Sequence, residues 1–143
     1  MLQVRPYDFN HDFEITETWR VLHGQAALPP LVFFTTDPTS APVGVIVHDE
    51  DTDCAAAWLY RDACGVLCWM AWTVTNPDIS PMKAVRAIDI AQDYLESIAR
   101  EEGFLYMVGM FKQESMVNHF TKCLGFQRCD TDKGHFMTGK ELT

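Results

Sequence analysis

The sequence has no long uninterrupted hydrophobic run. No apolar segment approaches the roughly 20 residues that a membrane-spanning helix needs. The first residues, Met1-Leu2-Gln3-Val4-Arg5, also lack the basic and then apolar order of a secretory signal. We therefore expect a cytoplasmic protein.

Positive charge is scarce. The chain has 11 Lys and Arg against 20 Asp and Glu, which gives a formal net charge of −9 at pH 7. Nucleic-acid binding depends on cationic side chains that displace counterions from phosphates, so we expect no nucleic-acid partner. The charge suits a cationic partner, either a small amine or a lysine-bearing protein, although it is equally explained by solubility alone.

Metal-binding and disulfide patterns are also missing. The cysteines are odd in number and form no C-x-x-C pair, so we expect reduced thiols and no disulfide. The histidines form no i, i+4 pair, and the acidic run 49–53 lacks the spacing of a calcium loop. We therefore expect no metal site. The cysteines are Cys54, Cys64, Cys68, Cys123 and Cys129.

The best-defined pattern is a strand followed by a long helix between residues 65 and 103. Residues 65–75 are apolar on both faces and rich in β-branched and aromatic side chains, as is typical of a central strand. Pro77 ends this strand. Ser80 and Pro81 then predict a helix N-terminus, and apolar positions recur every three or four residues from Met82 to Ala99. Gly103 predicts the helix end.

The remaining segments complete a single predicted domain over residues 1–143. We expect a helix over 8–24 with an imperfect apolar stripe, made of Phe9, Phe13, Ile15, Thr18 or Trp19, and Leu22. A second, shorter helix is expected from Glu114 or Ser115 to Gly125. This order predicts an α/β fold of the α+β kind, in which a mixed, mostly antiparallel sheet has helices on both faces. The other expected strands are 2–7, 31–35, 42–48, 55–61, 104–110, 126–129 and 135–138.

Two short motifs resemble those of the GNAT superfamily of N-acetyltransferases. Thr75-Asn76-Pro77 is similar to the family's V-x-P, which ends the strand before the helix that holds coenzyme A. Leu124-Gly125-Phe126 is similar to the sequence that closes the family's penultimate helix. The element order resembles the family over nearly the whole chain, as in the small GNAT-like proteins of bacterial viruses. The resemblance implies a GNAT-like fold, acetyl-CoA as co-substrate and, as in many such folds, a homodimer.

The phosphate-binding loop departs from the family pattern. The family's R/Q-x-x-G-x-G/A corresponds here to residues 80–85, where Lys83 and Val85 replace both glycines and Ser80 replaces the basic residue. A helix N-terminus still attracts anions, and Lys83 could supply a cation; the alternative is an ordinary solvated lysine. The resemblance places the cofactor along the strand end and the first helical turn. The candidate cofactor-binding residues are Thr73, Val74, Thr75, Met82, Lys83, Ala84 and Val85.

The catalytic residues are not evident from the sequence. The tyrosine that serves as acid in many family members corresponds to Thr121, whose hydroxyl does not ionise in the accessible pH range. His119 is close to it in sequence but points elsewhere on a helix. The central strand carries no base. The nearest weak candidates for base are His48, Glu50 and Tyr106.

Two functions therefore remain open from the sequence. The first is an acetyl-CoA-dependent N-acetyltransferase acting on an amine, such as a protein lysine. The second is a catalytically degenerate protein of the same fold that binds and modulates a protein partner, for instance a host protein if the chain is viral. The missing glycines and Thr121 favour the second, and the helix N-terminus at Ser80 favours the first.

Overall fold

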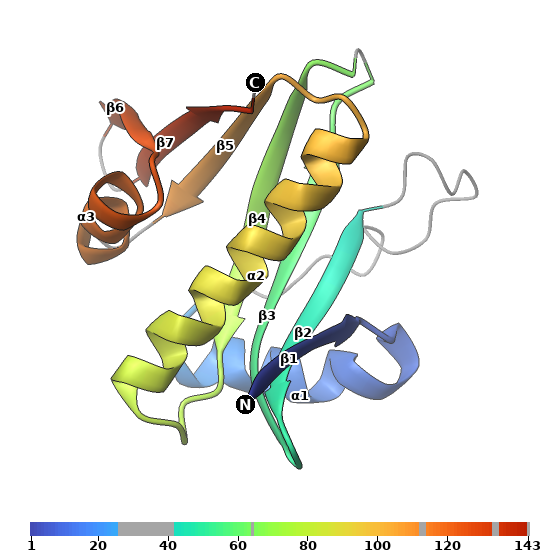
Figure 1. The fold of residues 1–143 in the computed structure, drawn as a ribbon. Helices are drawn as coiled ribbons and strands as arrows, with labels where there is room; N and C mark the ends of the chain where they lie inside the picture. The colour runs from blue at the N-terminus through green and yellow to red at the C-terminus, as the bar shows by residue number, and fades with distance from the viewer. Residues whose placement is uncertain (26–41, 64, 112–113, 133–134, 143) are drawn as a thin grey trace.

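We describe a computed structural model of the chain over residues 1–25, 42–63, 65–111, 114–132 and 135–142 (Figure 1). The strand expected at 31–35 lies outside the described residues. The other expected elements are present, in the expected order. They are β1 (Leu2–Pro6), α1 (Phe9–Leu22), β2 (Val43–Asp49), β3 (Thr52–Arg61), β4 (Leu67–Thr75), α2 (Pro81–Glu101), β5 (Tyr106–Phe111), α3 (Glu114–Cys123), β6 (Gln127–Asp132) and β7 (His135–Glu141).

The strands form one seven-stranded sheet in the order β1-β2-β3-β4-β5-β7-β6. Every neighbouring pair is antiparallel except β4 and β5, which are parallel. The parallel pair follows from the connection, because α2 returns the chain across the sheet before β5 begins. The expected mixed, mostly antiparallel sheet is confirmed.

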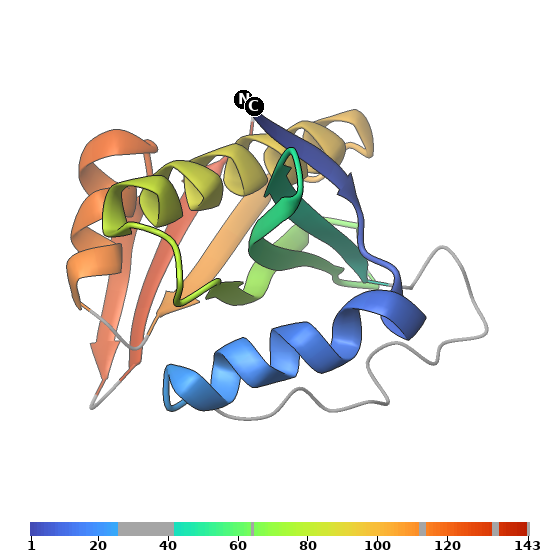
Figure 2. The same cartoon turned by 90° about the horizontal axis from the view of Figure 1, so that it is seen from below.

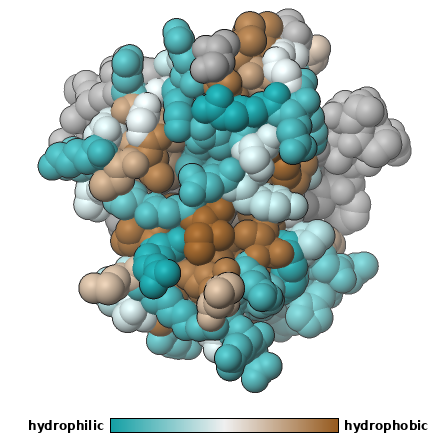
Figure 3. All heavy atoms as spheres, in the orientation of Figure 1, coloured by the Kyte–Doolittle hydropathy of each residue, from teal (hydrophilic) through white to brown (hydrophobic). Residues whose placement is uncertain are grey.

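Helices cover both faces of the sheet, as expected, in three layers (Figure 2). α1 lies on one face over a cluster built on Trp19, Ile46 and Trp58. α2 and α3 lie on the other face over the larger apolar core, which includes Leu59, Leu95 and other side chains of β2 to β5. On the α2 and α3 face the surface is mostly hydrophilic, with a small apolar group near the centre of the view (Figure 3). None of the described helices is both long and apolar enough to cross a membrane.

α2 begins as expected, with Ser80 as N-cap and Pro81 in the first helical position. The Ser80 hydroxyl accepts from the Lys83 N–H at 3.2 Å. The expected inward stripe is present from Ala87 to Ala99, but Met82 was wrongly included, since its side chain is 77% exposed. The first turn of α2 carries Met82 outward, so the stripe begins one turn later.

The apolar stripe expected on α1 is wrong at Ile15 and Leu22, although Trp19 is buried and Phe13 packs against the same cluster. Leu22 is 66% exposed and Ile15 is 42% exposed, whereas the buried residues of α1 are Asp12, Thr16, Trp19 and Arg20. Three of these four residues are polar, and their side chains are buried because each has a hydrogen-bond partner. α1 therefore packs on the sheet through Trp19, Phe13 and several polar contacts.

Candidate functional site

The candidate site is the gap that opens between β4 and β5. Their parallel ladder runs from Leu67 and Tyr106 to Met70 and Gly109, and then stops. β4 continues beside β3 as far as Thr75, while β5 continues beside β7. Each strand follows its other neighbour, so the two ends diverge (Figure 1). Between residues 71 and 75, β4 thus has an edge towards β5 without a strand partner, which is able to bind an extended chain through backbone hydrogen bonds.

A β-bulge lies in this unpaired part of β4. Ala56 pairs with Val74 and Trp58 pairs with Ala71, so two residues of β4, Trp72 and Thr73, stand opposite one residue of β3. Trp72 has a φ of 59°, in the left-handed region that is uncommon for a bulky side chain. Such a conformation costs on the order of 1–3 kcal/mol and persists only where its surroundings hold it.

The bulge also changes the face on which the β4 side chains lie. Cys68 and Met70 belong to the core under α2, so alternation alone would place Trp72 there as well. Trp72 instead packs with the cluster under α1, as does Val74. This reversal could not be predicted from the sequence, because residues 67–75 show no alternation of polar and apolar side chains before Thr73.

Two side chains of α1 bind the carbonyl groups of this segment. Arg20 donates from Nη1 to the Trp72 carbonyl oxygen at 2.9 Å, and its guanidinium lies 5.2 Å from the centre of the Trp72 ring. His23 donates from Nε2 to the Thr75 carbonyl oxygen at 2.8 Å, since a carbonyl only accepts. Sequence reasoning missed both residues, although Arg20 interrupts the apolar pattern of α1 where Trp19 is buried.

The N-terminus of α2 lies at the same end of the sheet as the gap, because only residues 76–80 join β4 to α2. Pro81 has no N–H, the Lys83 N–H is bound by Ser80, and the Ala84 N–H donates to the Ser80 carbonyl oxygen at 2.9 Å. Among the described residues in the first turn of α2, only the Met82 N–H has no hydrogen-bond partner in the structure. A helix N-terminus attracts anions through such amides and its dipole.

Lys83 is engaged by an acidic residue. Its Nζ lies 2.8 Å from Asp49 Oδ2 at the end of β2, and the amino group of Met1 lies 3.1 Å from Asp49 Oδ1. The hydrogen bond to Asp49 raises the pKa of Lys83, and the same bond, with that of the amino terminus, lowers the pKa of Asp49. Any anion at this helix end therefore competes with Asp49 for the ammonium group.

The predicted cofactor residues form two groups around the gap. Thr73, Val74 and Thr75 lie on the unpaired part of β4, and the Val74 side chain is buried. Met82, Lys83, Ala84 and Val85 make up the first turn of α2, where Ala84 and Val85 are half-buried. Both groups lie at one end of the sheet, and their part in cofactor binding stays a prediction.

The predicted catalytic residues are not brought together. His48 and Glu50 lie at the end of β2, on the far side of β3 from β4. Tyr106 begins β5 and pairs with Leu67, so it lies at the opposite end of β4 from Thr75. Thr121 lies on α3, where its hydroxyl donates to the Asn118 carbonyl oxygen at 3.1 Å. Their roles stay predictions.

His119 forms a link between α2 and α3, the two helices that cover the same face of the sheet. Its Nε2 lies 2.6 Å from Asp89 Oδ1, which joins α3 to α2. Among the described residues no cluster of three or more His, Cys, Asp or Glu side chains is arranged to hold a metal ion. His119 is thus accounted for by this helix contact.

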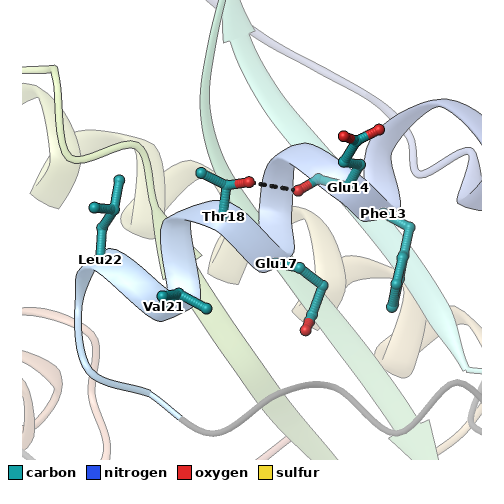
Figure 4. Close-up of a pocket in the computed structure, with 6 residues that line it drawn as sticks. All are labelled: Phe13, Glu14, Glu17, Thr18, Val21 and Leu22. Atoms are coloured by element: carbon teal, nitrogen blue, oxygen red, sulfur yellow. Dashed lines mark hydrogen bonds between the residues drawn. The ribbon is translucent and has the colours of Figure 1, made fainter.

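A shallow depression of about 470 Å³ flanks α1, and Figure 4 shows its lining. Among the described residues its lining comes from α1, and Thr18 within it donates to the Glu14 carbonyl oxygen at 2.9 Å. It contains none of the β4, β5 or α2 residues that form the gap. The lining residues are Phe13, Glu14, Glu17, Thr18, Val21 and Leu22.

These features define the class of fold. A mixed sheet whose one parallel pair separates at its carboxyl ends, with a helix N-terminus beside the gap, is the arrangement expected of the GNAT fold. No protein-family model matches the sequence, and comparison with curated proteins gave no match. Solved structures establish the fold.

One such structure is a Salmonella typhimurium protein, yncA, solved with its cofactor acetyl-CoA: TM-score 0.70, 17% identity, covering 99% of this chain and 94% of that chain. The ribosomal-protein-S18-alanine N-acetyltransferase of Escherichia coli has a TM-score of 0.72 at 11% identity, covering 100% and 95%. The GNAT domain of PAT from S. lividans has a TM-score of 0.69 at 14% identity, covering 98% and 90%. The chain thus has the GNAT fold over its whole length.

Proposed function

We propose that this protein is an acetyl-CoA-dependent N-acetyltransferase that acts on an amine. The observation that carries the proposal is the separation of β4 from β5 after Met70 and Gly109, with an unpaired β4 edge over residues 71–75. The proposal is supported by the GNAT fold and by similar structures solved with acetyl-CoA or coenzyme A.

The unpaired edge suits the pantetheine arm of the co-substrate. Its amide groups need backbone donors and acceptors, and residues 73–75 would supply them without depending on side-chain identity. Acetyl-CoA supplies an activated acyl group, which an amine accepts as the C–S bond breaks and the C–N bond forms, with one proton lost from nitrogen and one gained by sulfur. A backbone N–H of the bulge would stabilise the negative charge that develops on the carbonyl oxygen.

The diphosphate end of the site has fewer donors. The Met82 N–H and the dipole of α2 would bind it, while Lys83 would have to be shared with Asp49. We therefore expect coenzyme A to bind more weakly here than to a glycine-rich loop whose amides are all free. Residues 73–75 would hold the arm, and Met82 and Lys83 the phosphates.

For the acceptor, the charge of the chain favours a cationic group. A net charge of −9 raises the local concentration of ammonium groups. We therefore propose a lysine side chain of a protein as the acceptor, with a small amine as the alternative. The similar structures include an enzyme that acts on a ribosomal protein and an N-acetylglutamate synthase, so acceptors differ widely within this fold.

Calorimetric titration of acetyl-CoA and of free coenzyme A into the purified protein tests the proposal. We expect binding in the micromolar to high-micromolar range that weakens as salt is raised, because part of it is electrostatic. Transfer is then measured as free thiol released in the presence of lysine-bearing peptides. Absence of heat and of thermal stabilisation up to millimolar cofactor would contradict the proposal and favour the protein-binding alternative.

A further inference from the structure

The end of α1 is bonded to the backbone of the bulge, and we propose that Arg20 is a positioning residue for acyl transfer. In this proposal it holds the Trp72 carbonyl oxygen towards α1, so that the Thr73 N–H serves a ligand in the gap between β4 and β5. This inference rests on the proposed function, because it assigns that N–H to the carbonyl oxygen of the thioester. Arg20 itself need not touch the substrate.

The direction of the Thr73 N–H follows from peptide geometry. The peptide between Trp72 and Thr73 is trans and planar, so its C=O and N–H point in opposite directions. The carbonyl oxygen points to Arg20 on the α1 side of the sheet, where the bond is 2.9 Å long. The Thr73 N–H therefore points away from α1, and Thr73 has no opposite residue in the register of β4 with β3 or of β4 with β5.

The positive charge of Arg20 also makes the Thr73 N–H a stronger hydrogen-bond donor. A carbonyl that accepts a hydrogen bond polarises its peptide group, which makes the N–H of that group a better donor. Arg20 is 4% exposed, so little water weakens this effect. Burial lowers the pKa of Arg20, but an arginine starts so high that it stays charged, and the nearby Glu17 carboxylate favours the charge.

Further contacts hold the Arg20 side chain and the bulge in place relative to each other. The guanidinium lies over the Trp72 ring, which fixes the side chain that belongs to the strained residue. His23, one turn further along α1, holds the Thr75 carbonyl oxygen. The last turn of α1 therefore fixes both ends of the segment 72–75, which a β-ladder to β5 would otherwise do.

The experiment compares Arg20→Met with Arg20→Lys, and uses Arg61→Met as a matched control. Arg61 binds Glu102 near the other end of β4, so its replacement removes an arginine ion pair far from the gap. For each variant we would record the amide resonance of Thr73 and the carbon resonances of Trp72, which report φ. Calorimetry gives the affinity for coenzyme A, and kinetics give kcat and KM for acetyl-CoA.

In Arg20→Met we expect the Thr73 amide resonance to move and kcat to fall by about 10- to 100-fold. This is less than the roughly 100- to 1,000-fold cost of deleting an oxyanion donor, because the N–H is displaced and not removed. The affinity for coenzyme A and KM should change by less than about threefold, because the contact strengthens in the transition state. Arg20→Lys keeps a charged donor and should recover part of kcat. Arg61→Met should change neither the Thr73 resonance nor kcat.

Each other outcome has a defined meaning. Unchanged kcat and an unchanged Thr73 resonance in a folded Arg20→Met protein would overturn the inference and leave the proposed function intact. If Arg20→Met does not fold, the test uses Arg20→Lys alone. A folded Arg20→Lys protein that has the wild-type Thr73 resonance but a kcat far below the wild-type value would also overturn the inference. If the unmodified protein binds no coenzyme A, the proposed function fails, and with it the catalytic role of Arg20.

Discussion

Asp12→Asn should reduce stability in a pH-dependent manner, because Asp12 anchors the start of α1. Its side chain is fully buried and binds Arg5 through two contacts of 2.8 Å. Burial alone would raise the pKa of Asp12, but hydrogen bonds from Arg5, His11 and the Asp8 N–H lower it from 3.8 to about 2. That difference corresponds to about 2 kcal/mol of folding free energy at pH 7.

The sign of the pH dependence follows from the lowered pKa. The stabilisation is complete well above pH 3.8, the value for the unfolded chain, and is lost as the pH falls through about 2. At pH 3 about 1 kcal/mol should remain. The unfolding free energies of the protein and of Asp12→Asn should therefore differ by about 2 kcal/mol at pH 7 and by about half of that at pH 3.

Urea denaturation followed by tryptophan fluorescence measures both values, since Trp19 on the same helix is buried. The matched control is Glu14→Gln, which makes the same charge change on the exposed side of α1. We expect it to alter the unfolding free energy by less than about 0.5 kcal/mol. The reasoning is refuted if the two variants behave alike, or if the Asp12→Asn difference does not shrink on acidification.

Three further predictions concern other parts of the molecule. Lys83→Glu should weaken coenzyme A binding by about three- to tenfold at low salt and by less at high salt, because it places a second carboxylate beside Asp49. The affinity is measured by calorimetry, and an unchanged value would remove Lys83 from the site. Gly44→Ala should destabilise the fold by about 1–3 kcal/mol in urea, since an added Cβ would lie 2.5 Å from Trp58 Nε1, and an unchanged midpoint would contradict this. In a Cys64→Ser/Cys129→Ser background, a thiol reagent should modify exposed Cys123 quickly but Cys54 and Cys68 only after unfolding. Burial raises the pKa of the Cys54 and Cys68 thiols and brings that of Cys68 to about 12. Equal rates for the three thiols would show that the interior opens.

The elements of the fold were predictable where local chemistry decides them. Ser80 and Pro81 mark the start of α2 because a hydroxyl cap and a residue without an N–H suit a helix N-terminus. The amphipathic period of α2 and the apolar run of β4 are similarly local. α1 was harder, because its buried face is polar. Asp12 and Arg20 are buried only because Arg5 and the Trp72 carbonyl oxygen lie opposite them, which no local pattern reveals.

The candidate site was predictable only in outline. The resemblance pointed to residues 73–75 and to the first turn of α2, and these do lie at one end of the sheet. The bulge at Trp72 was not predictable, because a bulge depends on the register between two strands and residues 67–75 offer no glycine to mark it. The pairing of Lys83 with Asp49 joins positions 34 residues apart and was equally invisible.

A candidate site made mainly of backbone groups is compatible with the 11–17% identity between this chain and structures of the same fold. The divergence of β4 and β5 requires only that β4 stay paired with β3 and that β5 stay paired with β7. Many apolar sequences satisfy that condition. The strained residue in the gap is different, because a tryptophan with a φ of 59° needs specific support. That support comes from Arg20, on a helix that also buries the polar residues Asp12 and Thr16, of which Asp12 is held by Arg5 of β1. Selection for the site should therefore act on the polar face of α1 more strongly than on the residues of β4 that line the gap.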